Sequence, residues 1–288
     1  MKLKGRIIAV ICGVYSVLLE DKSIINIKAR GVFRYLKIKA IVGDYVLVEN
    51  NQIIEVFPRD NELVRPNISN IDVGIVVASL SEPQYSSLLL DKFLTLLNLN
   101  NIKPLIVLSK IDLNDDRELI NSIVLDYKSI GIDVIPYSNK TNEGLEQIKQ
   151  FISGKTIAFM GQTGVGKSSL INSIDGSFER DIGEFSKALN RGKHQTKEVI
   201  ILPYKDGFIA DTPGFSSLEL VCYKEELKDF FPFFTMYNNR CFFKDCQHIN
   251  EPKCFILEQV KLNKIIEKHY DNYKDIYDKL MFRKDRYH

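Results

Sequence analysis

Residues 156–168, TIAFMGQTGVGKS, decide the predicted fold, because a short apolar run is followed at once by a glycine-rich loop. The loop, Gly161 to Ser168, matches the pattern G-x-x-x-x-G-K-[ST]. In such loops the glycines let backbone N–H groups face phosphate oxygens, and the following helix N-terminus favours negative charge. The sequence therefore predicts a nucleotide phosphate site between a strand at 156–160 and a helix at 167–174.

Two side chains of this loop have expected chemical roles. The ammonium group of Lys167 would neutralise the β- and γ-phosphates, and the hydroxyl of Ser168 would bind Mg²⁺. The residues predicted to contact the nucleotide here are Gly161, Gln162, Thr163, Gly164, Val165, Gly166, Lys167, Ser168 and Ser169.

Two short motifs further along the chain fit the same phosphate site. Asp211-Thr212-Pro213-Gly214 follows a predicted strand at 207–210, so that the carboxylate of Asp211 can hold the Mg²⁺ shell and the Gly214 amide can sense the γ-phosphate. Thr196, in the polar segment 177–198, offers a second hydroxyl for Mg²⁺. An ordinary loop threonine is the alternative for Thr196.

Two loops before the phosphate loop indicate a guanine base. Ser109-Lys110-Ile111-Asp112 follows a predicted strand and resembles the N-K-x-D motif of GTPases, in which the aspartate accepts from two guanine N–H groups that adenine lacks. Ser109 replaces the usual asparagine, so we expect a shorter and weaker tie to the neighbouring loops. Ser138-Asn139-Lys140 resembles the S-A-K loop that supports guanine. Together these residues favour GTP over the alternative of an enzyme acting on ATP.

Strands and helices alternate from about residue 70, which predicts a mostly parallel α/β sheet with helices on both faces. Ligands of such sheets bind beyond the carboxyl ends of the strands, where all these motifs fall. The predicted strands are 73–79, 103–108, 133–137, 156–160, 199–202 and 207–210, and the predicted helices are 88–99, 116–130, 144–152 and 167–174. Because the base motifs precede the phosphate loop, we predict a circularly permuted P-loop GTPase.

The first 66 residues predict a small β-barrel, with an OB-fold as the leading candidate. Its expected strands are 3–10, 14–19, 23–29, 45–49 and 52–57. This part carries 11 Lys/Arg against 7 Asp/Glu, and basic and aromatic residues interleave at 28–39. That mixture suits phosphate contact and base stacking. A solvated basic edge with core aromatics is the alternative.

After residue 222 the pattern predicts a mainly helical domain, with helices at 223–230 and from about 258. Between them lie four residues in the spacing C-x4-C-x-H-x5-C, namely Cys241, Cys246, His248 and Cys254. A Cys₃His set suits a closed, tetrahedral, structural zinc site. Unrelated cysteines are the alternative. The predicted domains are therefore 1–66, 67–221 and 222–288.

The composition predicts a cytoplasmic protein without a membrane partner. The chain of 288 residues is 45% hydrophobic and 26% charged, with a formal net charge of +2. It has no apolar run near the ~20 residues of a membrane helix, and the first residues lack a signal-peptide core. We find no heptads or apolar interface stripe, so a monomer is expected.

These motifs together resemble the RsgA (YjeQ) family, bacterial GTPases that act in maturation of the small ribosomal subunit. The resemblance rests on the motif order, the Cys/His spacing, Asp211-Thr212-Pro213-Gly214-Phe215, and Gly192-Lys193-His194-Gln195-Thr196-Lys197. Two departures are Ser109 and the replacement of two family threonines around Thr196. The resemblance implies binding to the 30S subunit, contact of the barrel and zinc domain with 16S rRNA, ribosome-stimulated hydrolysis and release after turnover.

The catalytic water needs a partner that the motifs do not supply. Many GTPases use a glutamine just after D-x-x-G, but Phe215 stands there and cannot bind water. We expect slow intrinsic turnover and hypothesise that His194 positions the water when the ribosome orders its loop. Contact with RNA, or packing in the loop, is the alternative role for His194.

The alternative function is that of a GTP-binding, rRNA-associated assembly factor with negligible turnover. Ser109, Phe215 and Gln195 favour that alternative. The complete Mg²⁺ and phosphate set, which comprises Lys167, Ser168, Thr196 and Asp211, favours hydrolysis.

Overall fold

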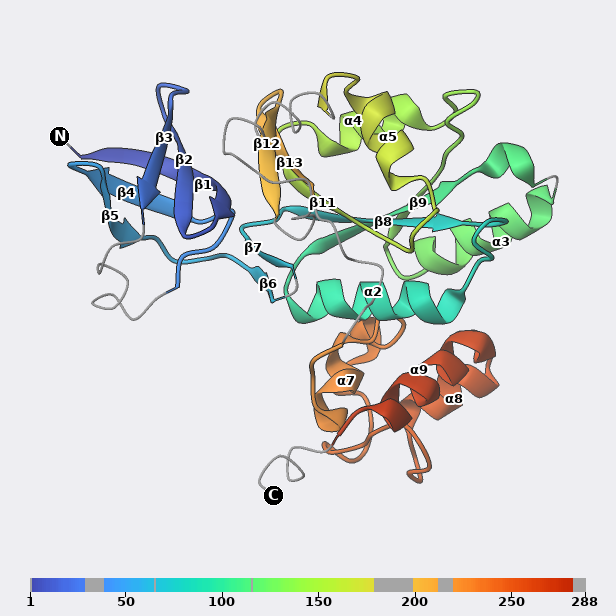
Figure 1. Ribbon diagram of the computed structural model, residues 1–288. Coiled ribbons are helices and arrows are strands. Elements are labelled where there is room, and N and C mark those ends of the chain that lie inside the picture. The colour runs from blue at the N-terminus through green and yellow to red at the C-terminus, as the bar shows by residue number, and fades with distance from the viewer. Residues whose placement is uncertain are drawn as a thin grey trace.

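The computed structural model describes residues 2–28, 39–64, 66–114, 116–178, 199–211 and 220–281, with the backbone alone described at Asp211. Figure 1 shows a strand-rich N-terminal part beside a central sheet, and a helical C-terminal part beneath it.

The N-terminal part is a five-stranded antiparallel barrel with OB-fold strand order. Strand β1 pairs with both β2 and β4, β2 pairs with β3, β4 pairs with β5, and β3 lies against β5. The strands are β1 (Leu3–Ile11), β2 (Val14–Leu19), β3 (Ile24–Lys28), β4 (Tyr45–Glu49) and β5 (Gln52–Val56). Inward-facing residues such as Ile7, Val17 and Val46 are fully buried. The predicted barrel is confirmed.

Strand β1 also connects the barrel to the central sheet. The register of β1 against β2 shifts between Ile7 and Ala9. A bulge of this kind bends a strand and increases its twist. Beyond the shift, Ala9 forms a bridge with Ile200 of β12, so that barrel and central sheet share hydrogen bonding across this strand.

The central sheet has the order β10-β9-β8-β11-β13-β12, in which only β12 is antiparallel to its neighbour β13. The strands are β8 (Val73–Ser79), β9 (Lys103–Ser109), β10 (Asp133–Pro136), β11 (Thr156–Met160), β12 (Ile200–Tyr204) and β13 (Gly207–Asp211), and a short hairpin of β6 (Glu62–Val64) and β7 (Asn67–Ser69) precedes them. The strands are almost continuously apolar, as expected where both faces are covered.

Two hydrophobic cores lie on the two faces of this sheet. Helices α2 (Ser87–Leu99) and α3 (Arg117–Lys128) pack on one face, and α4 (Leu145–Ile152) and α5 (Lys167–Ile174) pack on the other. Alternate strand residues enter opposite cores: Ile106 packs with the α2 and α3 side, whereas Leu105 packs with the α4 and α5 side. The predicted α/β fold class is confirmed, with helix ends within about two residues of the expected ones.

Within residues 220–281, the C-terminal part forms three α-helices and a metal-ligand loop. The helices are α7 (Lys224–Phe230), α8 (Phe255–Lys261) and α9 (Glu267–Lys279), and the 3₁₀ turn η2 (Thr235–Tyr237) follows α7. The central part has a 3₁₀ turn of its own, η1 (Ile111–Leu113), after β9. The single polar helix expected from about 258 is two helices. Asn263 adopts a left-handed φ of 53°, which ends the helical run, and the buried Ile265 turns the chain into the core.

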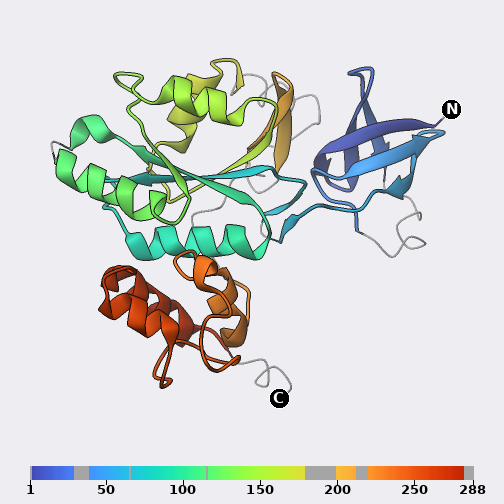
Figure 2. The ribbon, with the colours of Figure 1, turned by 180° about the vertical axis from the view of Figure 1, so that it is seen from behind.

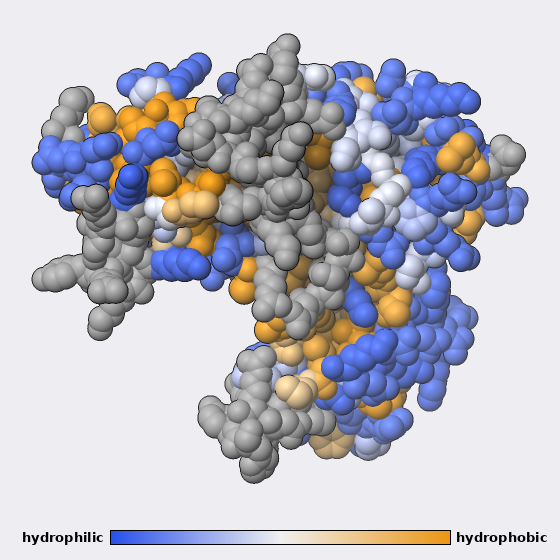
Figure 3. All heavy atoms as spheres, viewed as in Figure 1, coloured by the Kyte–Doolittle hydropathy of each residue, from blue (hydrophilic) through white to orange (hydrophobic). Residues whose placement is uncertain are grey.

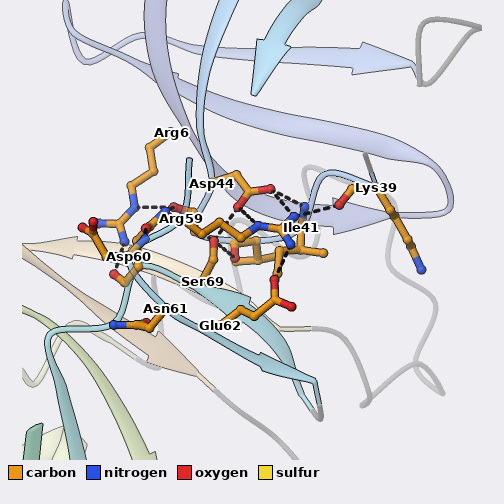
Figure 4. Close-up of polar contacts among 12 residues, drawn as sticks. Arg6, Lys39, Ile41, Asp44, Arg59, Asp60, Asn61, Glu62 and Ser69 are labelled. Carbon is orange, nitrogen blue, oxygen red and sulfur yellow. Dashed lines mark hydrogen bonds and ion pairs between the residues drawn. The ribbon is translucent and has the colours of Figure 1, made fainter. Parts of the chain in front are cut away.

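Two buried ionic side chains, Arg6 and Asp44, hold the barrel against the sheet, each through its own partners (Figure 4). Arg6 of β1 donates from Nη1 to Thr156 Oγ1 of β11 at 2.7 Å and from Nη2 to Asn70 O at 2.8 Å. Asp44, fully buried, accepts from Arg59 Nε at 2.8 Å and from Ser69 Oγ at 2.6 Å. Asp44 is therefore satisfied by the segment that joins the barrel to β8, and Arg6 bonds both to that segment and to β11.

A second buried carboxylate joins the C-terminal part to the central part. Figure 2 shows α2 lying between the sheet and the C-terminal helices. Asp91 of α2 accepts from Tyr127 OH of α3 at 2.8 Å and from Asn272 Nδ2 of α9 at 2.6 Å, and it lies 2.7 Å from His269 Nδ1. Phe233 stacks on the His269 ring at 3.8 Å. This cluster fixes α9 on α2.

Among the residues that the structure describes, no helix combines the length and apolar character needed to cross a lipid bilayer.

We expect Asp91→Ala to lower the free energy of unfolding by about 3 kcal/mol, because three side chains from α3 and α9 lose a buried partner. Urea denaturation followed by far-UV circular dichroism measures this loss. Asp278→Ala, at an exposed position of α9, is the matched control and should change the free energy of unfolding by less than about 0.5 kcal/mol. Equal losses in the two variants would contradict the role assigned to Asp91.

Candidate nucleotide site and metal centre

The phosphate loop follows β11 and turns sharply at its first glycine. Gly161 has a φ of 137°, and a Cβ at this position would lie 2.3 Å from Val77 O of β8. Only glycine fits that close approach. Gly166, with a φ of 95°, is the N-cap of α5, so that the loop leads directly into the N-terminus of this helix, an end that favours anions.

The loop lysine lies over the loop itself. Lys167 Nζ donates to Gly161 O at 2.5 Å and to Gln162 O at 2.7 Å. Burial lowers the pKa of this ammonium group below its ordinary value. A partly desolvated cation on a glycine-rich loop is well suited to an anionic ligand. Ser168 and Ser169 follow it in the first turn of α5 and are exposed.

The first base loop is tied directly to the phosphate loop. Ser109 is only 1% exposed, and its hydroxyl lies 2.6 Å from Val165 O and 3.3 Å from Ala78 O. The short side chain thus reaches the backbone of the loop at 161–168. Next in the chain, Lys110 adopts a φ of 58° and its Nζ donates to Glu82 O at 2.5 Å.

Ser138 of the second base loop (138–140) orients the exposed carboxylate of Asp112 in the first base loop (109–112). Ser138, fully buried, donates from Oγ to Asp112 Oδ1 at 2.7 Å, while its oxygen accepts from the amides of Lys140 and Thr141 at 3.2 Å each. One oxygen of Asp112 is therefore fixed on the protein. Because the side chain is exposed, a base can reach the carboxylate.

Asn139 links the second base loop to α5. Its Oδ1 lies 2.6 Å from Ser173 Oγ of α5 and accepts from Tyr137 OH at 2.9 Å. The structure thus brings together the residues predicted for the phosphate and the base at 109–112, 138–140 and 161–169.

Three predicted residues, Thr196, His194 and Gly214, lie outside the described residues. Asp211 is the last residue of β13, and its backbone pairs with Ile200 of β12. Since β13 is parallel to β11, Asp211 stands at the same edge of the sheet as the phosphate loop.

The sequence reasoning missed the segment after β8. A cavity beside the phosphate loop is lined by residues of this segment, of α2 and of the loop, including Ser79, Gln84, Ser86 and Gln162. A role for the segment after β8 in the site could have been inferred from the sequence, because this segment also follows the carboxyl end of a parallel strand.

The four predicted metal ligands converge in the C-terminal part. Their ligand atoms all lie within 4.8 Å of one another. His248 Nδ1 is 3.4 Å from the Sγ atoms of Cys241, Cys246 and Cys254, and the Cys241 and Cys254 sulfurs are 3.9 Å apart. Tetrahedral Zn²⁺ bond lengths give about 3.6 Å between S and N and about 3.8 Å between two S atoms. This group can hold a tetrahedral metal ion.

The burial of the cluster favours the neutral forms of its side chains. Burial raises the pKa of Cys246 to about 12 and lowers the pKa of His248 to about 4. The imidazole is thus neutral at pH 7, and the thiols need a nearby cation to lose their protons. Phe255 N donates to Cys241 Sγ at 3.3 Å, and Tyr270 OH donates to His248 O at 2.9 Å. These contacts fix the ligand loop on α8 and α9.

Comparisons with known proteins agree with this architecture. The family model RsgA GTPase matches residues 56–221, and the model RsgA N-terminal domain matches residues 4–54. A Bacillus velezensis protein named small ribosomal subunit biogenesis GTPase RsgA is 42% identical over 294 residues, covering 99% of each chain. A Leuconostoc citreum protein of the same name is 40% identical over 292 residues, covering 99% of this chain and 97% of its own.

Two solved structures share the fold over nearly the whole length. YjeQ from Thermotoga maritima superposes with a TM-score of 0.85 at 31% identity, covering 97% of this chain and 99% of its own. YloQ, described as a circularly permuted GTPase, gives a TM-score of 0.81 at 36% identity, covering 99% and 96%. With its phosphate loop, permuted motif order and full-length relatives, the chain belongs to the RsgA family of circularly permuted GTPases.

Proposed function

We propose that this GTPase binds the 30S ribosomal subunit, assists its late maturation and hydrolyses GTP with stimulation by the subunit. The observation that carries the proposal is the full-length similarity to proteins named small ribosomal subunit biogenesis GTPase RsgA. The contacts between the phosphate loop and the base loops support the nucleotide-binding part of it, because Ser109 and Ser138 join segments that are far apart in the chain.

Phosphate and metal binding are proposed for the loop and the strand end beside it. The ammonium group of Lys167 neutralises the β- and γ-phosphates. The exposed hydroxyl of Ser168 lies at the sheet edge where β13 ends in Asp211, which suits a shared Mg²⁺ ion, with Thr196 as the second hydroxyl. Gly214 senses the γ-phosphate. When bound, Mg²⁺ offsets negative charge on the phosphates.

Base selection is proposed for Asp112, which Ser138 holds in place. Its carboxylate accepts from two guanine N–H groups, whereas adenine offers no such donor pair. Lys110 lies along the base plane. Ser109 and Asn139 hold the two base loops on the phosphate loop and on α5.

The RNA and metal parts of the proposal concern the two flanking domains. We assign residues 1–66 to a barrel domain and 222–288 to a zinc domain, both contacting 16S rRNA, with 67–221 as the GTPase domain. Zinc is the proposed metal because three thiolates and one imidazole nitrogen at these separations are its usual structural ligands. A monomeric, cytoplasmic protein fits a ribosome partner.

We expect GTP hydrolysis by the purified chain to be slow alone and to rise at least tenfold with 30S subunits, because the position after D-x-x-G is Phe215. His194→Ala should remove about 100-fold of the stimulated rate, within the usual range for a positioned acid or base. Phosphate release under saturating GTP measures both, with Gln195→Ala as the neighbouring control. Tight GTP binding without stimulation would instead favour the assembly factor of negligible turnover, and full stimulation of His194→Ala would remove the proposed role of this histidine.

We expect Asp112→Asn to weaken GTP binding about 100-fold, since two hydrogen bonds to a charged acceptor are lost. Binding of xanthosine triphosphate should improve, because the asparagine amide can donate to the oxygen at the base C2 position. Competition against a fluorescent GDP analogue measures both affinities. Asp133→Asn, at the amino end of β10 and so away from the edge where the base loops lie, is the control. Unchanged GTP affinity in Asp112→Asn would place the base elsewhere.

We expect the purified chain to contain about one zinc ion and Cys246→Ser to lose it, since a closed structural site needs all four ligands. Loss of the ion should lower the melting temperature by several degrees, because the loop has little core of its own. Elemental analysis and calorimetry measure these quantities, with Cys12→Ser, outside the cluster, as control. Full zinc content in Cys246→Ser would contradict the assigned ligand set.

A further inference from the structure

Two neighbouring phenylalanines between the first two metal ligands face the solvent. Phe242 is 69% exposed and Phe243 is 40% exposed, and their rings meet edge to face at 4.9 Å with an interplanar angle of 84°. Phe231 and Phe234 of the same part of the chain are, by contrast, fully buried. Exposure of aromatic surface to water is unfavourable, so two adjacent exposed phenylalanine rings on an ordered loop indicate a surface that binds a partner.

The backbone of this loop holds the two rings in place. Cys241 precedes them and Cys246 follows them, and both are metal-ligand candidates. Cys246 N also donates to Phe243 O at 3.3 Å, and Lys228 Nζ donates to Lys244 O at 2.9 Å. A partner that binds the rings therefore loses little conformational entropy in ordering the loop.

Basic side chains lie in the same loop as the exposed rings. Lys253 Nζ lies 5.0 Å from the centroid of the Phe242 ring, and Lys244 and Arg240 are exposed on the same loop. Asp245 is the acidic side chain of the stretch 240–246. Figure 3 shows hydrophobic residues among hydrophilic ones on the surface of the C-terminal part. Exposed aromatic rings beside lysine and arginine can stack nucleobases and bind phosphates together. An apolar protein surface would desolvate the charges of these side chains, so a nucleic acid fits better.

We propose that Phe242 is a nucleobase-stacking site for single-stranded RNA, with Lys253 and its basic neighbours Lys244 and Arg240 binding the adjacent phosphates. A base that stacks on the exposed ring brings its phosphate within reach of the Lys253 ammonium group, which already lies against the ring. The source of the RNA, an unpaired segment of the small-subunit rRNA, rests on the proposed function. The stacking chemistry itself does not depend on that source.

The test measures binding of the full-length chain to a fluorescein-labelled oligouridylate and, separately, to purified 30S subunits. Phe242→Ala should weaken oligouridylate binding about tenfold without changing the salt dependence, and Phe242→Trp should restore it. Lys253→Gln should lower the slope of log affinity against log salt by about 0.7, the value for one phosphate contact on a single strand. Leu125→Ala, which removes an equally exposed side chain on α3, is the matched control and should bind as the wild type does.

Wild-type affinity of Phe242→Ala for oligouridylate would overturn the proposal. A loss of 30S affinity in Phe242→Ala without any loss of RNA affinity would also overturn it, by assigning the contact to a ribosomal protein. A distinct result concerns the proposed function alone. If 30S subunits neither bind nor stimulate the wild type while Phe242→Ala still loses RNA affinity, the stacking site stands and the ribosomal assignment fails.

Discussion

The buried guanidinium of Arg6 is the contact on which the arrangement of the barrel and the nucleotide site depends. It leaves the barrel on β1 and reaches Thr156, the first residue of the strand that ends in the phosphate loop. Asp72 Oδ2 accepts from the Thr156 amide at 2.6 Å, and the rings of Tyr45 and Phe208 lie 4.9 and 4.5 Å from the guanidinium carbon. Burial lowers the Arg6 pKa, which shows the cost of desolvating this cation. A buried charge that loses its partners is strongly destabilising, so the barrel cannot swing away from β11 while the chain stays folded.

The same constraint explains how a rearranged chain order still builds one site. The carboxyl ends of β9, β10 and β11 meet at one sheet edge whatever their order in the sequence, and short polar side chains complete the connections there. On the other side of the central part, Asp91 joins the C-terminal part to the sheet, because it binds α9 to α2, which packs directly against the sheet. Each flanking part is thus joined to the central part by a buried charged side chain with several hydrogen-bond partners: Arg6, which donates, and Asp91, which accepts.

Local patterns predicted most of the fold and much of the candidate site. The glycine spacing at 161–166, the apolar strands and the Cys/His spacing are encoded within about 15 consecutive residues, and all have their counterparts in the structure. Contacts between distant residues carried no such signal. In the sequence, Arg6 is indistinguishable from the other basic residues of the barrel. Likewise, nothing in the sequence around Asp91 indicated a contact with His269, which is 178 residues away. The break between α8 and α9 was missed because it depends on one left-handed residue, Asn263, in an otherwise helical pattern.

Ser109 shows why a departure from a motif is not the same as a lost contact. The sequence suggested a weaker tie, since a serine side chain is shorter than that of asparagine. In the structure Ser109 is buried beside the phosphate loop, so its short side chain is long enough for the hydroxyl to donate to Val165 O at 2.6 Å. A hydrogen bond that is shielded from water does not compete with solvent, and removal of the hydroxyl would leave a buried carbonyl unsatisfied. The energetic value of this contact is therefore set by its burial and geometry, which motif comparison does not report.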